Sequence, residues 1–124
     1  MHALGRALSA LAVLFLGVDA LAKLLQLGPV VAGTAELGYP PSAVLVIGIL
    51  EALCVAAYVV PPTAVLGALL LTGYLGGAIA THLRAGNPLF SHILFPVYVA
   101  LFVWGGLFLR EARLRALLPL RVAR

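Results

Sequence analysis

The stretch "SAVLVIGILEALCVAAYVV", residues 42–60, contains one charged residue, Glu51, among side chains that are otherwise apolar or weakly polar. A helix needs roughly 20 such residues to cross about 30 Å of hydrocarbon. Three other segments approach or reach this length, at 4–27, 63–83 and 89–110. Proline and glycine mark the connections "LGPVVAGTAELGYPPS", "VPPT" and "RAGNPLF" between the segments. The sequence therefore predicts an all-α integral membrane protein, a four-helix bundle.

The composition supports this prediction and limits the functions that the chain can have. Of its 124 residues, 64% are hydrophobic and 10% are charged, which lies outside the usual range of soluble domains. We expect one domain at 1–110 and a basic tail at 111–124, with no room for a separate soluble catalytic module. Basic residues beside a membrane span favour a lipid bilayer as partner over nucleic acid. Because Cys54 is the only cysteine and the carboxylates are scattered, we expect no disulfide and no metal site.

Arginine placement predicts the direction of the spans. Arg6 lies near the start of the first span, and five arginines lie at or after the end of the last: Arg110, Arg113, Arg115, Arg121 and Arg124. The positive-inside rule therefore places both termini in the cytoplasm, in agreement with an even number of spans. Arg84, in the third connection, would then lie outside, against the rule.

Charged residues within the spans are the first candidates for a site. Asp19 and Lys23 lie one helical turn apart, and a rise of about 1.5 Å per residue puts Asp19 and Glu51 at similar depths, about 12 and 13 Å below the outer surface. A charge facing lipid costs at least about 2.5–3.5 kcal/mol, so these side chains should turn into the bundle. Two carboxylates against one lysine leave a negative charge that takes up a proton or recruits another cation. Arg84, or a protonated His82 or His92, is our candidate for that cation.

The third span carries small residues at helical spacing. Ala68, Thr72 and Gly76 repeat every four residues, and Gly73 and Gly77 form a GxxxG pair beside them. Small residues at this spacing allow helix backbones to approach closely in a membrane. We expect this face to pack inside the bundle, with a dimer of two chains as the alternative.

Four elements of the sequence carry a resemblance to a known family. They are Gly17 and Lys23 in the first span, "LVIGILE" at 45–51, "GYLGGAIATHLRAGNP" at 73–88 and "FVWGGLFLR" at 102–110. With these elements the chain resembles the DoxX-like family of small four-helix membrane proteins over about residues 12–110.

The resemblance implies a four-helix bundle in a bacterial or archaeal cytoplasmic membrane. One branch of the family supplies a subunit associated with a thiosulfate:quinone oxidoreductase, and related eukaryotic proteins act as membrane assembly factors. Lys23, Glu51, His82 and Arg84 match the polar pattern of the family, but the resemblance assigns none of them as catalytic. Tyr74, beside the glycines, is the aromatic residue that we expect to join this site.

Three functions follow from these observations. We expect an accessory subunit linked to redox or quinone metabolism, with a quinone as ligand, a membrane oxidoreductase as partner and a polar pocket near the outer leaflet, rather than an autonomous enzyme. The alternative is an assembly or chaperone-like protein that binds another membrane protein. A small-solute transporter is disfavoured because the inner halves of the spans carry few polar groups. The residues leave open whether Asp19, Lys23 and Glu51 form a structural ion-pair cluster or bind a ligand.

Overall fold

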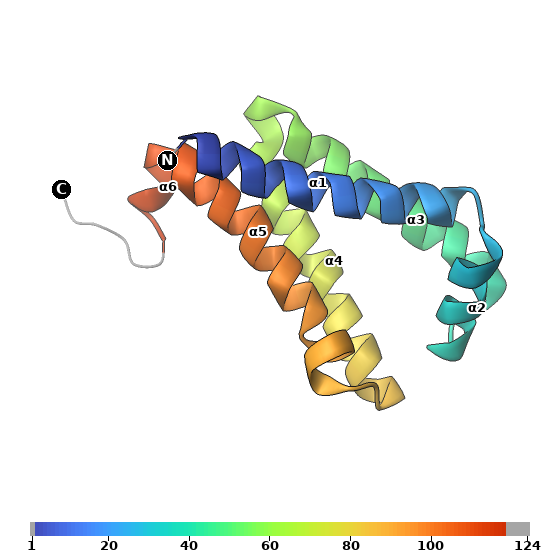
Figure 1. Ribbon diagram of the computed structural model, residues 1–124. Helices are drawn as coiled ribbons and strands as arrows, with labels where there is room; N and C mark the ends of the chain where they lie inside the picture. Colours follow the sequence, from blue (N-terminus) through green and yellow to red (C-terminus); the bar gives the residue numbers. More distant parts are fainter. Residues whose placement is uncertain (1, 119–124) are drawn as a thin grey trace.

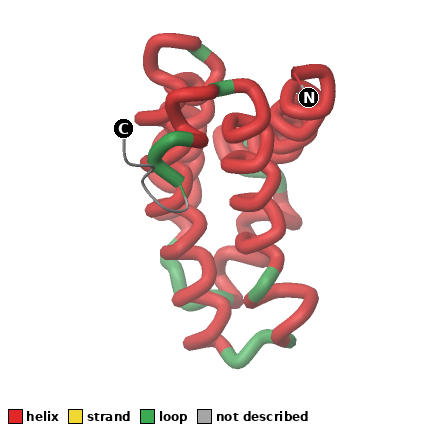
Figure 2. The backbone as a smooth tube through the Cα atoms, turned by 90° about the vertical axis from the view of Figure 1, so that its left-hand side faces the viewer, coloured by secondary structure: helices red, strands yellow, loops and turns green. Residues whose placement is uncertain are grey.

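The computed structural model describes residues 2–118 of the chain, and nearly all of this part is helical (Figures 1 and 2). Four of its helical segments are long and apolar enough to cross a membrane, which confirms the predicted all-α membrane fold. The elements in chain order are α1 (His2–Leu24), α2 (Gly28–Glu36), α3 (Pro41–Val59), the 3₁₀ turn η1 (Pro61–Thr63), α4 (Ala64–Ala85), the π-helical turn η2 (Leu89–Ile93), α5 (Phe95–Arg110) and α6 (Ala112–Arg115).

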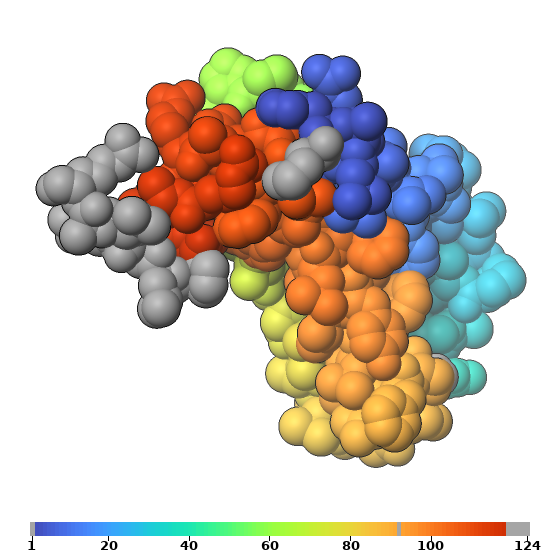
Figure 3. Space-filling model, turned by 60° about the vertical axis from the view of Figure 1, so that its left-hand side comes forward, coloured from blue at the N-terminus to red at the C-terminus, as the bar shows by residue number. Residues whose placement is uncertain are grey.

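The four long helices form a ring in which α1 and α4 each pack against α3 and α5. Leu16 of α1, Leu71 of α4 and Val103 of α5 are almost fully buried in the shared apolar core. α1 and α5 lie side by side near the N-terminus and then diverge, α1 toward α2 and α5 back toward η2 (Figures 1 and 3). The bundle is therefore closed at the end with the N-terminus, which we call the terminal end, and splayed at the α2 end.

Proline and glycine set the ends of the helices. Pro41 lies in the first turn of α3, where its missing N–H breaks no helical hydrogen bond. Gly86 follows α4 with a left-handed φ of 74° that few other residues adopt. Pro96 lies in the first turn of α5, directly after η2. The predicted span at 89–110 is therefore two pieces, a π-helical turn and a shorter α-helix.

The connection between the first two spans contains a helix that the sequence analysis did not predict. α1 ends at Leu24, and α2 begins at Gly28 with Pro29 in its first turn. Thr34 of α2 is buried, and its hydroxyl donates a hydrogen bond to the carbonyl of Val30 at 2.8 Å. α2 thus packs on the ends of α1 and α3 instead of forming an open loop.

The predicted basic tail begins with a short helix, α6. α6 follows α5 directly and lies at the same end of the molecule as the N-terminus (Figure 1). The Glu111 side chain caps α6 by accepting a hydrogen bond from the backbone N–H of Arg113. Arg121 and Arg124, which belong to the same predicted tail, lie outside the described residues.

The small residues of α4 are used differently from our expectation. Ala68 is fully buried, and the Thr72 hydroxyl accepts a hydrogen bond from Trp104 Nε1 of α5 at 2.7 Å. Gly73, Gly76 and Gly77 are exposed, and a Cβ added at any of them would meet no described atom outside the α4 backbone within 4 Å. The predicted packing of these three glycines within the chain is therefore not observed, because no other element of the described chain contacts them closely.

Candidate functional site

Lys23 is the centre of a polar cluster built by three helices. Its ammonium group donates hydrogen bonds to the carboxylate of Asp19 on α1, to Glu51 Oε1 on α3 at 3.1 Å and to the Tyr74 hydroxyl on α4 at 2.8 Å. A lysine has three N–H donors, so each has a partner. We call these four residues the Lys23 cluster, and it brings together four of the six polar residues predicted from the sequence.

A glycine allows α1 and α3 to approach at this level. A Cβ on Gly48 would lie 2.8 Å from Lys23 Cβ and 3.2 Å from the backbone nitrogen of Leu24. Gly48 lies about one helical turn before Glu51. The close approach therefore places the Glu51 carboxylate against the Lys23 ammonium.

Burial differs among the charged members of the cluster. The Glu51 side chain is 1% exposed, the Lys23 side chain 15% and the Asp19 side chain 36%. Glu51 Oε2 is buried and has no hydrogen-bond partner among the described residues. Two carboxylates therefore share one ammonium, and the more deeply buried carboxylate has one oxygen left over.

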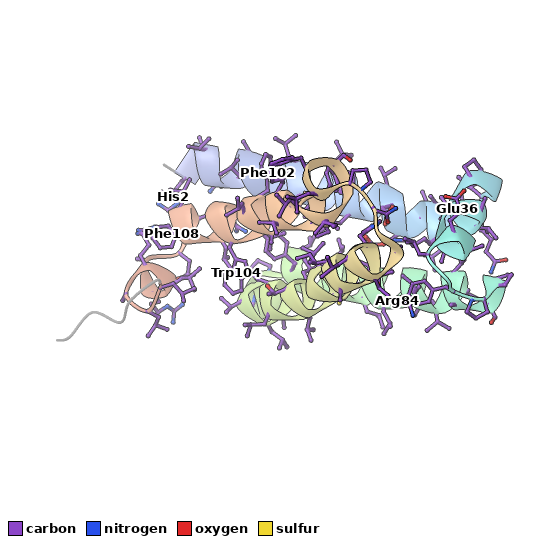
Figure 4. The ribbon with its side chains drawn as sticks, turned by 90° about the horizontal axis from the view of Figure 1, so that it is seen from below. His2, Glu36, Arg84, Phe102, Trp104 and Phe108 are labelled. Carbon is purple, nitrogen blue, oxygen red and sulfur yellow. The ribbon has the colours of Figure 1, made fainter. Side chains whose placement is uncertain are left out.

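Arg84 does not supply the second cation that we expected. Its side chain is exposed, and its Nη2 atom donates a hydrogen bond to the carbonyl of Leu37 at 3.0 Å. Within residues 2–118, the only salt bridges of Asp19 and Glu51 are those with Lys23. The position of Arg84 near the end of α4 instead ties that helix to the chain between α2 and α3 (Figure 4).

His82 lies beside the cluster and forms a separate contact. Its Nδ1 atom is 2.8 Å from Asn87 Oδ1, just beyond the end of α4. In the part of the chain that the structure describes, no group of three or more histidine, cysteine, aspartate or glutamate residues is placed to hold a metal ion. His82 therefore joins the site as a wall residue of the two cavities described next.

Two cavities meet at Lys23. The α3–α4 cavity has a volume of about 290 Å³ and lies between α3 and α4, next to the segment that follows α2. The α2 cavity has a volume of about 330 Å³ and lies between α2 and the ends of α1 and α4. Both are lined by Lys23, Thr34, Leu37 and His82. The Lys23 cluster is therefore next to open space on two sides.

The walls of the two cavities differ in chemistry. The α3–α4 cavity adds apolar and small residues together with hydroxyl groups: Tyr39, Ile47, Leu50, Gly73, Tyr74, Gly77, Ala78 and Thr81. The α2 cavity adds the carboxylates of Asp19 and Glu36 and the side chain of Asn87, together with Val30, Gly33 and Ala85. Figure 4 shows Glu36 and Arg84 at this end of the bundle and His2 and Phe108 at the other.

A second cluster of buried polar residues lies at the terminal end, and it was not predicted from the sequence. The Tyr58 hydroxyl is 2.7 Å from Ser9 Oγ and donates to the Val103 carbonyl at 2.6 Å. Arg110 Nη2 donates to Ser9 Oγ at 3.1 Å. We call Ser9, Tyr58 and Arg110 the terminal network. Its members come from α1, α3 and α5, so only the pairing of these helices reveals it.

Two glycines on different helices lie where the terminal network forms. A Cβ on Gly5 would lie 2.8 Å from the Gly106 carbonyl oxygen, and one on Gly106 would lie 2.2 Å from Ser9 Oγ. These close approaches press α1 against α5 beside Ser9. The glycines that pack helices in this chain are therefore outside the stripe that the sequence analysis selected.

Comparison of the sequence with known proteins identifies the family of the chain. The model of the DoxX-like family matches residues 7–106, which include the Lys23 cluster and both cavities' helical walls. Searches of curated proteins and of solved structures found no match. Since the match covers most of the chain and agrees with the four-helix membrane fold, this protein belongs to the DoxX-like family.

Proposed function

We propose that this protein binds the ring of a lipid-soluble quinone in the α3–α4 cavity, as an accessory subunit of a membrane oxidoreductase. One observation carries the proposal: the Tyr74 hydroxyl, held by Lys23, lies on the wall of a mostly apolar cavity within a membrane-spanning bundle. The resemblance to a family of which one branch accompanies a thiosulfate:quinone oxidoreductase supports the choice of ligand class and the accessory role.

Tyr74 is the group that would contact the ligand. Its oxygen accepts a hydrogen bond from Lys23, and among the described residues no acceptor is found for its own proton. A hydroxyl that accepts from an ammonium group becomes a stronger donor, because hydrogen bonds in a chain polarise one another. Tyr74 is thus suited to donate to a quinone carbonyl, and Lys23 acts as a positioning residue through it.

The cavity matches the ring of such a ligand better than a larger molecule. Ligand pockets typically measure about 300–1,000 Å³, and the α3–α4 cavity has about 290 Å³. Ile47, Leu50 and Ala78 provide apolar walls for the faces of a ring. A long isoprenoid tail would remain in the surrounding lipid.

Binding of a short-chain ubiquinone analogue to the purified protein in lipid nanodiscs tests the proposal. The Tyr74→Phe variant removes one hydroxyl, and we expect its Kd to rise about tenfold, which corresponds to about 1.4 kcal/mol. Tyr98→Phe is the matched control, because the Tyr98 hydroxyl donates to the Phe90 carbonyl and lies outside the cavity. No saturable binding to the unaltered protein, or equal effects of the two variants, would refute the proposal.

A second candidate function, binding of another membrane protein during its assembly, is favoured by the exposed glycines of α4. Gly73, Gly76 and Gly77 have open space beside them in the described chain. Exposed small residues permit close approach of a partner helix. Crosslinking from position 76 to one defined membrane protein, with no quinone binding, would favour this function.

The orientation of the protein is part of the proposal. We propose that the terminal end faces the cytoplasm, because Arg110, Arg113 and Arg115 lie there. Single cysteines at Glu36 and Ala116, in a Cys54→Ala background, provide the test. A membrane-impermeant thiol reagent added to intact cells should label position 36 and leave position 116 unlabelled. The reverse pattern would overturn the orientation.

A further inference from the structure

The α3–α4 cavity has an unusual wall toward the lipid. Gly73 and Gly77 lie one helical turn apart on α4, both line this cavity, and both are exposed. Leu50 of α3 also lines the cavity and is 52% exposed. Between these three residues, the α4 wall of the cavity therefore consists of helix backbone without side chains.

Packing within the chain does not explain the two glycines. Apart from the α4 backbone, no atom of the described residues lies within 4 Å of the place where either Cβ would be. Glycine inside a helix is destabilising by roughly 0.5–1 kcal/mol relative to alanine. Their backbone conformation is ordinary α-helix, so larger residues would be compatible with the local fold. What they provide here is open space at the wall of the cavity.

We propose that Gly73 and Gly77 form a lateral entrance, through which the ligand ring reaches Tyr74 directly from the hydrocarbon between α3 and α4. This inference rests on the proposed function, since it concerns the route of the same ligand. Side chains at 73 and 77 would project over the gap beside Leu50 and narrow it. Glycine at both positions leaves a passage along the α4 backbone.

The α2 cavity is the other route to Lys23, and its chemistry opposes it. It is bordered by Asp19, Lys23 and Glu36, whose charged groups a lipid-soluble ring would have to pass. Moving apolar surface past charged and hydrated groups gives up its favourable transfer into hydrocarbon. The lateral route requires no such step, because Leu50, Gly73 and Gly77 present only apolar surface and helical backbone.

The neighbouring Gly76 makes a matched control possible. It lies on the same helix, is exposed and has no atom within 4 Å of its Cβ position, as for the other two glycines. It lines neither the α3–α4 cavity nor the α2 cavity. A large residue at 76 therefore alters α4 to a similar degree without narrowing the entrance.

Association rates of the short-chain ubiquinone analogue, measured by stopped flow in lipid nanodiscs, test the inference. We expect Gly73→Leu/Gly77→Leu to slow association at least tenfold, Gly73→Ala/Gly77→Ala to slow it less, and Gly76→Leu to leave it within twofold of the unaltered protein. The alanine pair adds one methyl group at each site and keeps the test valid if the leucine pair disturbs folding.

Each other outcome has a distinct meaning. If the unaltered protein binds the analogue and both double variants associate at the unaltered rate, the entrance is refuted while the proposed function stands. Equal slowing by Gly76→Leu also refutes the entrance and indicates a general effect on α4. If the unaltered protein does not bind the analogue, the proposed function fails, and the entrance fails with it.

Discussion

The two ends of this bundle bury polar groups in contrasting ways. At the terminal end, Ser9 and Tyr58 bond to each other and to a backbone carbonyl, and glycines press α1 against α5 beside them. At the α2 end, Lys23 binds two carboxylates and a hydroxyl, and cavities lie on two sides of it. The first arrangement fastens helices together, whereas the second holds charges beside open space.

This difference separates two uses of buried polarity in a membrane protein. Hydrogen bonds between closely packed helices contribute to association of the bundle. Charges in the same environment are costly unless they are paired, and they are candidates for functional sites. Comparing variants at the two ends measures how far this separation holds.

The largest effect is expected from removing the cation of the Lys23 cluster. Lys23→Met leaves the buried Glu51 carboxylate and Asp19 without a partner, and breaking a buried pair in this way costs about 3–5 kcal/mol. Arg110→Met at the terminal end removes a bond to Ser9 and leaves no carboxylate without a partner, so a smaller loss of about 1.5–3 kcal/mol is expected. Unfolding in mixed detergent micelles gives both values. Equal losses would show that charge is not what distinguishes the two ends.

The next effect concerns the close contact of α1 and α5. Gly106→Ala puts a Cβ 2.2 Å from Ser9 Oγ and 2.7 Å from the Ser9 backbone nitrogen, and overpacking of this kind costs about 1–3 kcal/mol. Gly77→Ala, beside the α3–α4 cavity, meets no atom and should not lower stability. Thermal unfolding midpoints measured on the two variants decide the matter. A midpoint for Gly106→Ala at or above that of the unaltered protein would contradict the contact.

Two tyrosine variants, one at each end, should have opposite effects: one should lower mainly stability and the other mainly quinone binding. Tyr58→Phe removes the hydroxyl shared by Ser9 and the Val103 carbonyl, lowering the free energy of unfolding by about 1–3 kcal/mol and leaving quinone binding unchanged. Tyr74→Phe should weaken quinone binding more than it lowers stability. Both quantities are measured on both variants, and parallel changes in the two would show that the ends do not differ in function.

The smallest effect is expected at Gly76. Gly76→Ala adds a methyl group to exposed helix with open space around it, so stability should rise by at most about 1 kcal/mol. A loss of more than this amount in lipid, together with a change in oligomeric state on size-exclusion chromatography, would show that a second helix covers this face. That result would strengthen the interaction function over ligand binding.

The sequence was sufficient for the four spans and for the meeting of Asp19, Lys23 and Glu51. Long apolar runs determine spans, and the depths of the charges follow from helix rise. The hydrogen-bond partners of long side chains could not be predicted in the same way. Arg84 donates to the Leu37 carbonyl because α2 brings that carbonyl within reach. The terminal network depends on which helices are neighbours, and neither hydropathy nor residue spacing encodes that pairing.

The glycine stripe shows the limit of motif reading in a membrane helix. Gly73, Gly76 and Gly77 have the spacing of a packing motif, yet the glycines at which helices approach closely are others, among them Gly5, Gly48 and Gly106. Spacing indicates which residues share a face, but the direction of that face depends on the rotation of the helix within the bundle. All the neighbouring helices together set this rotation, so it cannot be predicted from the sequence of one segment.

The hydrogen bond between Trp104 and Thr72 gives this molecule a natural optical reporter. Trp104 is the only tryptophan of the chain, and its indole nitrogen is joined to α4 from α5. Any event that separates these two helices breaks that bond and changes the surroundings of the indole. The intrinsic emission of the protein therefore follows the spacing of α4 and α5 in the membrane, without an attached label.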